Sequence, residues 1–422
     1  MFNNLETQLN VKKVALSEMY PVTQLFKSYK LKNIEERIQT QFEEELIQSK
    51  VKLGSSVAIA VGSRGIAQLK KIVSVVIEEI IKVGGKPFIV PAMGSHGGAT
   101  AEGQARVLES FGICERTMGV PVVSSMETVG VCKYKKDVTL HFDKHAYRAD
   151  AIVVINRIKA HTDFNGPVES GLSKMVTIGL GKHKGASLLH QLGFDNFHEV
   201  IPEAAQLLIE NTPIALGAAI LENAYHDVVD VEILPAEEIS EREPLLCKKA
   251  KEFMPSLPFA DLDVLYIDEI GKNISGSGLD TNIVGRKVGI VEPKINKIIV
   301  GDITAESYGN ATGIGLADIT TQKCLQKIDF TSMYLNCITS TDLRGVKIPL
   351  VAESDQQALE IACQTSNQPN LEKLKVVRIK NTLSLETFFV SRALLPEIEQ
   401  LEGIQVVGDP VKFEFNQNGY LS

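Results

Sequence analysis

The residues best suited to chemistry lie between Asn156 and His190, in the stretch NRIKAHTDFNGPVESGLSKMVTIGLGKHKGASLLH. Here His161, Lys174 and His190 stand in a glycine-rich frame that fits neither a regular helix nor a regular strand. Imidazoles titrate near neutral pH and bind metals, and a lysine amine can form a carbon–nitrogen bond with a carbonyl-type partner. The stretch follows the aliphatic run AIVVI, and open α/β sheets bind ligands beyond the carboxyl ends of their strands. We therefore predict a functional site here.

Other polar groups of this stretch could assist. The segment GLSK, from Gly171 to Lys174, could present backbone amides, the Ser173 hydroxyl and an amine to a phosphate or carbonyl. Asp163 and Glu169 could orient an imidazole or bind a hydroxyl.

Five other histidines are predicted to have structural or surface roles. His183 lies between Lys182 and Lys184, and we expect these three side chains to be solvated. Four more have no convergent polar neighbours in the sequence: His141, His145, His198 and His226.

Two further loops follow predicted strands. VGSRGI places Arg64 between glycines, where its planar guanidinium could bind a carboxylate or phosphate; a solvated surface turn is the alternative. PAMGSHGGAT places Ser95, His96 and Gly97 before a helix, which favours a bound phosphate; the alternative is a turn whose histidine satisfies a backbone group. Because the two strands are consecutive and parallel, we expect Arg64 and His96 at the same edge of the sheet.

A fourth glycine-rich loop, GKNISGSGLDTNIVGR from Gly271 to Arg286, lies in the later half of the chain. It suits a nucleotide, a substrate or a domain interface. It matches neither the Walker pattern nor GxGxxG, because no helix is expected to begin after GSG. The sequence also lacks HExxH and paired CxxC, so it predicts no classical zinc site.

Strand–turn–helix units must position these loops. SVAIAVGS and PFIVPA are β-rich runs, each followed by a helical pattern, which predicts a parallel sheet covered by helices on both faces. VGVCKY and VTLHF predict a hairpin, and PIALGAAILE and VVDVEILP are expected to continue the alternation of strands and helices. The two prolines of MPSLPFADLD mark a domain boundary, which predicts an α/β fold with domains 1–260 and 261–422, both with mainly parallel sheets.

Composition narrows the function classes. A net charge of −8 argues against nucleic acid or anionic membrane as a partner, and no apolar run approaches the roughly 20 residues of a membrane helix. The start MFNNLETQLNVKKV lacks the apolar core of a signal peptide. The six cysteines are dispersed, which predicts reduced, buried thiols and a cytoplasmic protein.

Together these loops resemble the nickel-dependent lactate racemase family over nearly the whole chain. Arg64 and His96 are 32 residues apart, and Lys174 and His190 are 16 apart, close to the spacing of the family's Arg/His and Lys/His pairs. The family carries a nickel-pincer nucleotide, a pyridinium-3,5-bisthiocarboxylic acid mononucleotide with a nickel–carbon bond and two sulfur ligands. The resemblance implies that domain 1–260 binds this cofactor, that domain 261–422 completes the substrate pocket, and that the active site lies in the cleft between them.

The resemblance also implies a role for each matching residue. Lys174 would anchor the cofactor as a thioamide, and His190 would bind nickel. His96 and His161 would be the two acid–base groups, one on each face of the substrate, and Arg64 would hold the substrate carboxylate. The activity implied is racemisation or epimerisation of a 2-hydroxy acid by reversible hydride transfer through a 2-keto acid. The other cofactor contacts implied are Ser95, Gly97, Gly171 and Ser173.

One segment departs from the family pattern. The family's lactate enzymes carry a Tyr-Gln-x-x-Lys segment, whereas the comparable place here, from Asp329 to Leu335, reads DFTSMYL. This change favours a larger or more polar 2-hydroxy acid than lactate, with Ser332, Tyr334 and Arg344 as contacts.

Two other functions remain open from the sequence. One is a non-catalytic protein that binds a nucleotide or hydroxy acid, and the other is a metal-assisted hydrolase or lyase on the same scaffold. Partners implied by the resemblance are the small-molecule substrate and the enzymes that make the cofactor. The oligomeric state is left open, a homo-oligomer included.

Overall fold

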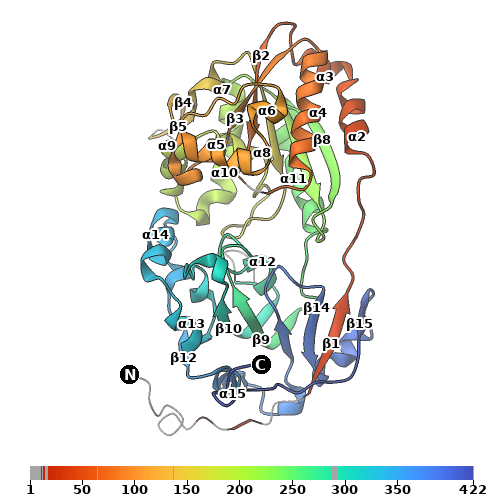
Figure 1. Ribbon diagram of the computed structural model, residues 1–422, viewed down its shortest axis with the longest axis vertical. Helices are drawn as coiled ribbons and strands as arrows, with labels where there is room; N and C mark the ends of the chain where they lie inside the picture. The colour runs from red at the N-terminus through yellow and green to blue at the C-terminus, as the bar shows by residue number, and fades with distance from the viewer. Residues whose placement is uncertain are drawn as a thin grey trace. The chain divides into compact units, whose positions relative to one another are not determined.

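The computed structural model describes residues 11, 13–14, 18–63, 65–135, 137–286 and 292–421. The chain forms two compact units (Figure 1). The central unit is Lys27–Met254, and the terminal unit joins Met1–Phe26 to Pro255–Ser422. The later change of unit falls within the two-proline segment, six residues before the predicted division after residue 260. The earlier change differs from the sequence prediction, which assigned the whole N-terminal stretch to the first domain.

The central unit is built on a five-stranded sheet with the order β3-β2-β6-β7-β8. The first four strands in this order pair in parallel, and the last is antiparallel to its neighbour. The strands of this unit, including a separate hairpin, are β2 (Ser56–Val61), β3 (Lys86–Pro91), β4 (Thr128–Tyr134), β5 (Val138–Asp143), β6 (Ala151–Arg157), β7 (Ile214–Glu222) and β8 (Val228–Pro235).

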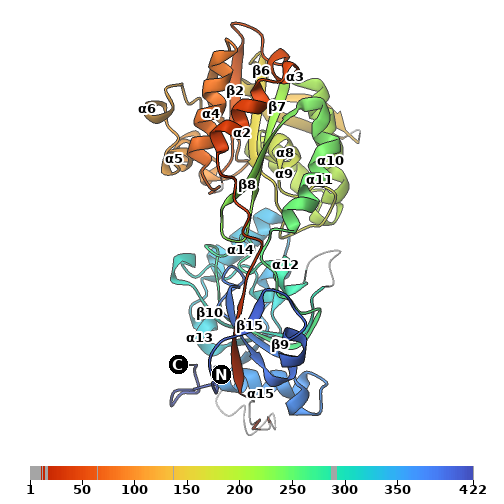
Figure 2. The same ribbon diagram turned by 90° about the vertical axis from the view of Figure 1, so that its right-hand side faces the viewer.

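Helices cover both faces of this sheet, as the continuous apolar character of its strands requires. Helices α2 and α4 pack on one face, and α10 and α11 on the other (Figure 2). Helix α4 shows why: its apolar residues recur at helical spacing and its inner face is buried. The helices of this unit are α2 (Ile34–Phe42), α3 (Glu45–Ser49), α4 (Leu69–Lys82), α5 (Ala101–Ser110), α6 (Glu115–Met118), α7 (Lys144–Tyr147), α8 (Leu172–Lys174), α9 (Lys182–His190), α10 (Phe197–Asn211) and α11 (Ile239–Lys251).

Two local predictions for the central unit are corrected. Strands β7 and β8 form an antiparallel hairpin, because the connection between Glu222 and Val228 is too short for a crossover. The stretch after Gly171 is helical, with α8 continuing through a π-helix (Met175–Gly179) before α9. Its glycines, which weaken an isolated helix, allow close packing here: a Cβ at Gly185 would lie 3.3 Å from the Cβ of His141. The predicted hairpin of β4 and β5 is confirmed.

The terminal unit contains an eight-stranded sheet with the order β12-β11-β10-β9-β13-β14-β1-β15. The pairs from β12 to β13 are parallel, and the pairs from β13 to β15 are antiparallel. Both sheets together confirm the predicted α/β class with mainly parallel pairing. The strands are β1 (Met19–Gln24), β9 (Asp261–Ile270), β10 (Lys294–Ile303), β11 (Ile319–Thr321), β12 (Leu350–Ala352), β13 (Val376–Ile379), β14 (Thr387–Ser391) and β15 (Ile404–Val406).

The helices of the terminal unit are α12 (Thr281–Val284), α13 (Gln322–Gln326), α14 (Phe330–Ser340), α15 (Asp355–Thr365) and α16 (Leu395–Ile398). Helix α12 begins inside the fourth glycine-rich loop, where the sequence predicted none, because the Asp280 side chain accepts from the amide of Asn282 and caps it.

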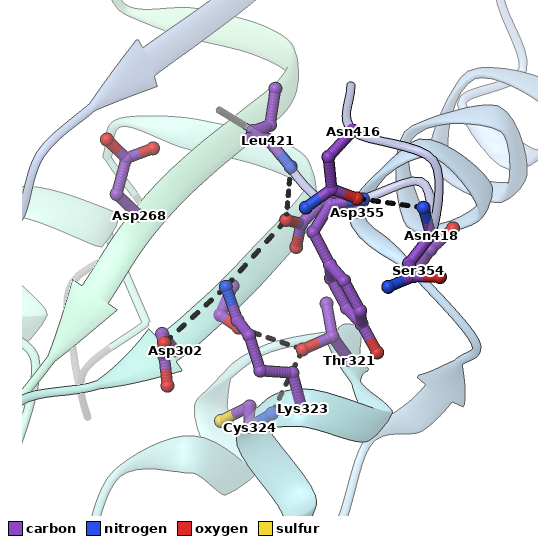
Figure 3. A network of polar contacts seen from close by, with 12 residues as sticks. Asp268, Asp302, Thr321, Lys323, Cys324, Ser354, Asp355, Asn416, Asn418 and Leu421 are labelled. Atoms are coloured by element: carbon purple, nitrogen blue, oxygen red, sulfur yellow. Dashed lines mark hydrogen bonds and ion pairs between the residues drawn. The ribbon is translucent and has the colours of Figure 1, made fainter. Parts of the chain in front are cut away.

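The last residues of the chain are fastened to helix α15 by a buried carboxylate (Figure 3). The amide of Leu421 donates to Asp355 Oδ2 at 2.8 Å, and Lys323 Nζ lies 3.9 Å from the same oxygen and 3.4 Å from Asp302. Asp355 is almost fully buried, so these contacts offset the cost of burying its charge. The C-terminal segment is therefore an integral part of this unit.

Two sequence expectations concern the chain as a whole. The six cysteines are free thiols, and Cys114 and Cys132 are half-buried, unlike the other four. Within the described ranges, every helix is too short or too polar to cross a membrane.

We predict that the terminal unit requires β1 in order to fold. Strand β1 lies between β14 and β15, and β15 pairs with β1. A fragment of residues 255–422 should therefore aggregate or stay unfolded, because it loses the middle strand of a three-strand antiparallel edge. Replacing residues 27–254 by a short linker should restore folding, since Gln24 Nε2 donates to Ser256 O at 3.0 Å. Circular dichroism and size-exclusion chromatography check this, with a scrambled β1 as the control; equal folding of the two linked fragments would contradict it.

Candidate functional site

Three loops meet at one edge of the central sheet. The loops after β2, β3 and β6 all leave the carboxyl ends of parallel neighbours. Ser63 Oγ, after β2, lies 3.0 Å from His96 Nδ1, after β3. This contact confirms that these two loops share an edge. Arg64 itself lies outside the described residues.

The loop that carries His96 is a tight turn held by glycine and glutamine. Gly94 and Gly97 have φ of +58° and +65°, and a Cβ at Gly97 would lie 2.6 Å from the amide nitrogen of Gln104. Gln104 is fully buried and donates from Nε2 to the carbonyls of Gly94 and His96. Ser95 is half-buried and the His96 side chain is exposed. The turn thus presents His96 on a backbone fixed from inside.

His161 is oriented by its own loop. Its Nδ1 accepts from the amide of Asp163 at 3.0 Å, and the Asp163 carboxylate lies 3.7 Å from the same nitrogen. Its main-chain amide donates to Glu169 Oε2 at 2.6 Å, and Glu169 Oε1 pairs with Lys251 at 2.6 Å. The acceptor role of Nδ1 places the proton of the neutral ring on Nε2. Asp163 and Glu169 therefore both organise His161, as the sequence suggested.

A cluster of phenylalanine rings contacts both His161 and His190. The ring of Phe194 lies 6.1 Å from His161 and 5.5 Å from His190. Phe164 packs 4.6 Å from His161, and Phe197 stacks 5.7 Å from His190. These rings were not predicted from the sequence, although Phe164 and Phe194 lie within four residues of the two histidines.

His190 is a neutral imidazole beside an amine. It ends helix α9, and burial together with the charge of Lys174 lowers its pKa to about 4. At neutral pH the ring therefore carries a single proton, on one of its two nitrogens. This neutral form is the state that binds metals. Lys174, at the end of α8, is half-buried and close enough to act on this titration. The charge of Lys174 therefore acts on the imidazole of His190.

The GLSK turn before Lys174 is held by a residue that the sequence analysis missed. Glu243, on α11, is fully buried and accepts from the amide and the hydroxyl of Ser173. A Cβ at Gly171 would lie 2.1 Å from Glu243 Oε1, and Asn156 Nδ2 donates to Gly171 O at 2.7 Å. Gly171 and Ser173, predicted as cofactor contacts, are thus engaged in shaping the turn. The only sequence signal for Glu243 was a carboxylate on the apolar face of a helix.

Lys182 corrects another prediction. His183 and Lys184 are exposed as expected, but Lys182 is fully buried. Its Nζ lies 3.2 Å from the buried carboxylate of Asp143, which makes burial of the charge tolerable. Burial lowers the pKa of Lys182, and Asp143 opposes this effect.

The predicted substrate contacts of the later half belong to the terminal unit. Ser332 Oγ donates to Asp329, the residue that caps α14, and Tyr334 is 45% exposed on the same helix. Arg344 is paired with Asp342 at 2.6 Å. In the fourth glycine-rich loop, Arg286 pairs with Asp318 and so stabilises the fold locally.

The described side chains do not form a metal-binding cluster of their own. Among the described residues, no three or more His, Cys, Asp or Glu side chains gather in a way that could hold a metal ion.

The chain is similar to a known family over residues 2–199 and to solved structures over most of its length. Residues 2–199 match the family described as the lactate racemase N-terminal domain. No curated protein matches the chain. Among solved structures, the lactate racemase apoprotein from Thermoanaerobacterium thermosaccharolyticum is similar over 87% of this chain and 99% of its own, with a TM-score of 0.54 and 14% identity. A protein from Thermotoga maritima is similar over 83% and 97%, with a TM-score of 0.50 and 12% identity. At such identities the likeness shows a shared fold.

We predict that Glu243→Gln removes a pH dependence of stability. Burial raises the pKa of Glu243 to about 7, so the folded state holds a proton that the unfolded state releases above its ordinary pKa near 4.5. The stabilising contribution is full below pH 4.5 and is lost as the pH rises to 7, by roughly 3 kcal/mol, since one pKa unit corresponds to about 1.4 kcal/mol. The amide is neutral and lacks this slope. Urea unfolding between pH 4 and 8 measures it, with Glu241→Gln, an exposed carboxylate of the same helix, as the control. Parallel pH profiles for wild type and Glu243→Gln would refute it.

We also predict that Lys174→Met raises the pKa of His190. The ammonium disfavours the imidazolium, so its removal should raise the pKa of His190 from about 4, while burial, the larger cause, keeps it below 6.5. Histidine titration by NMR in the apoprotein measures this shift. Lys184→Met, an exposed lysine of helix α9, should leave it unchanged. An unchanged midpoint in Lys174→Met would show that the two groups are not neighbours.

Proposed function

Since residues 2–199 belong to the lactate racemase N-terminal domain family, we propose that the protein racemises or epimerises a 2-hydroxy acid. The observation that carries the proposal is the His190 imidazole, which burial keeps neutral and on which the charge of Lys174 acts. His161 and His190 both pack against the ring of Phe194. This common neighbour supports a substrate whose reacting carbon lies between the two imidazoles.

The residues present fit a nickel-pincer nucleotide. The Lys174 amine would form the thioamide link, and the neutral ring of His190 would bind nickel, a metal for which imidazole is a suitable ligand. When bound, this group supplies a reversible acceptor for the hydride of the α-carbon. The Glu243 and Asn156 contacts would hold the turn that carries Lys174 in place during loading.

The chain's own contribution is acid–base chemistry from two loops. One imidazole takes the proton of the substrate hydroxyl as the carbonyl of the 2-keto acid forms, and the other gives a proton to that oxygen when the alcohol is restored. His161 suits both states: its Nδ1 accepts the Asp163 amide when the ring is neutral, and the Asp163 carboxylate, 3.7 Å away, can receive an Nδ1–H when the ring is charged. Ser63 can serve His96 in the same way, because a hydroxyl both donates and accepts.

Substrate recognition follows from the remaining predicted residues. Arg64 would bind the carboxylate of a 2-hydroxy acid larger or more polar than lactate. Loading would require partner enzymes that make the cofactor.

We predict that holo-protein, produced together with cofactor-making enzymes, interconverts the stereoisomers of a 2-hydroxy acid. Chiral separation of single-enantiomer substrates detects the activity, and mass spectrometry should find the cofactor adduct on Lys174. Lys174→Ala should lose the adduct, and His96→Ala or His161→Ala should lower kcat by about 10²- to 10⁴-fold, as for loss of a general acid–base group.

Lys184→Ala is the control for the anchor, because its side chain is exposed. An adduct and full activity in Lys174→Ala would reject the assignment. Loss of an α-deuterium label to solvent during turnover would favour a lyase over hydride transfer, and binding without turnover would favour a non-catalytic protein.

A further inference from the structure

The feature that the proposed function does not use is a buried polar network around Lys182. The Lys182 ammonium donates two hydrogen bonds, to the Pro91 carbonyl and to Gln104 Oε1 at 3.2 Å, and it forms an ion pair with Asp143 Oδ2 at 3.2 Å. Lys182, Gln104 and Asp143 are each fully buried. With these two hydrogen bonds and this ion pair, the buried Lys182 is placed to organise structure and not to bind a ligand.

Gln104 carries this organisation to the His96 turn. Its Oε1 accepts from Lys182, which leaves Nε2 to donate to Gly94 O at 2.9 Å and His96 O at 3.3 Å. The orientation of the amide is fixed, because only the oxygen can accept from an ammonium and only the nitrogen can donate to carbonyls. Lys182 thus sets which way Gln104 holds the turn.

The network joins two parts of the proposed site. Lys182 begins helix α9, which His190 ends. Its backbone has φ of +55°, a left-handed conformation that a lysine adopts at a cost and that the surrounding contacts must maintain. The same turn is tied a second time, since the amide of Gly94 donates to Gly179 O at 3.0 Å. Helix α9 and the His96 turn are therefore linked through buried contacts.

We propose that Lys182 is a positioning residue that acts through Gln104 to hold the His96 turn in a fixed position relative to helix α9. The network fixes the backbone from which His96 projects before any ligand binds. Its catalytic consequence rests on the proposed function, but the positioning itself can be measured in the apoprotein.

The test compares hydrogen exchange of the turn amides in apoprotein variants. Gln104→Met removes the amide, and Lys182→Met with Asp143→Asn removes the ammonium without leaving a buried carboxylate unpaired; Asn can still cap α7. Exchange at Gly94, His96 and Ala99 should accelerate about tenfold or more at unchanged global stability, because local opening of the turn becomes easier. Lys184→Met and Arg106→Met, exposed neighbours on α9 and α5, should leave it unchanged.

A double-mutant comparison distinguishes positioning through Gln104 from a general loosening of the structure around the turn. Adding Gln104→Met to the Lys182→Met/Asp143→Asn protein should accelerate exchange no further, since residues that act in series are not additive. If the lysine variant does not fold, Gln104→Met alone decides the question. In loaded enzyme Gln104→Met should lower kcat about tenfold or more with little change in KM, because Gln104 acts on the position of His96.

Unchanged exchange of the turn in folded variants would overturn the proposal, whatever the activity. Faster exchange with additive effects would overturn the route through Gln104. Faster, non-additive exchange in a protein whose loaded wild type is inactive would uphold the positioning and reject the proposed function.

Discussion

The structure of the site depends on how closely the helical segment from Gly171 to His190 approaches its neighbours. A Cβ at Gly171 would collide with Glu243, and one at Gly179 would lie 2.8 Å from the Ala92 carbonyl. These approaches are available only to glycine. Because the segment lies so close, its helices α8 and α9 present Lys174, Lys182 and His190 at three different places. A bulkier segment would displace all three side chains together.

Close packing buries ionisable groups, and two of them, Lys182 and Glu243, have different polar surroundings. Lys182 receives a carboxylate and two neutral acceptors. Glu243 receives hydrogen-bond donors from Ser173, and burial raises its pKa to about 7 although these donors oppose the rise. A buried ion without an opposite charge tends to become neutral, whereas a paired one can stay charged. His190 follows the first course, which leaves its ring neutral at physiological pH.

Much of the site could be predicted from local patterns. The apolar strands and the helical periodicity of α4 predicted a parallel sheet with helices on both faces. Parallel pairing then predicted that the loops of Arg64 and His96 would share one edge, and the contact of Ser63 with His96 shows that these loops do. The GLSK turn was found as a site but interpreted as a ligand contact, because nothing nearby in the sequence announced Glu243, seventy residues later. Lys182 and Lys184 are alike in sequence, yet one is buried and the other exposed.

The sequence by itself determined the class of the fold, the loops that could carry chemistry and the residue types that would perform it. These follow from periodicity, glycine content and side-chain chemistry, which act over a few residues. Only the tertiary structure decided which lysine is buried, what holds the Lys174 turn, and that the ring of His190 is neutral. Burial and charge pairing depend on groups such as Asp143, Gln104 and Glu243 that are distant in the chain. Their effects arise only when folding removes water and brings these groups within contact distance.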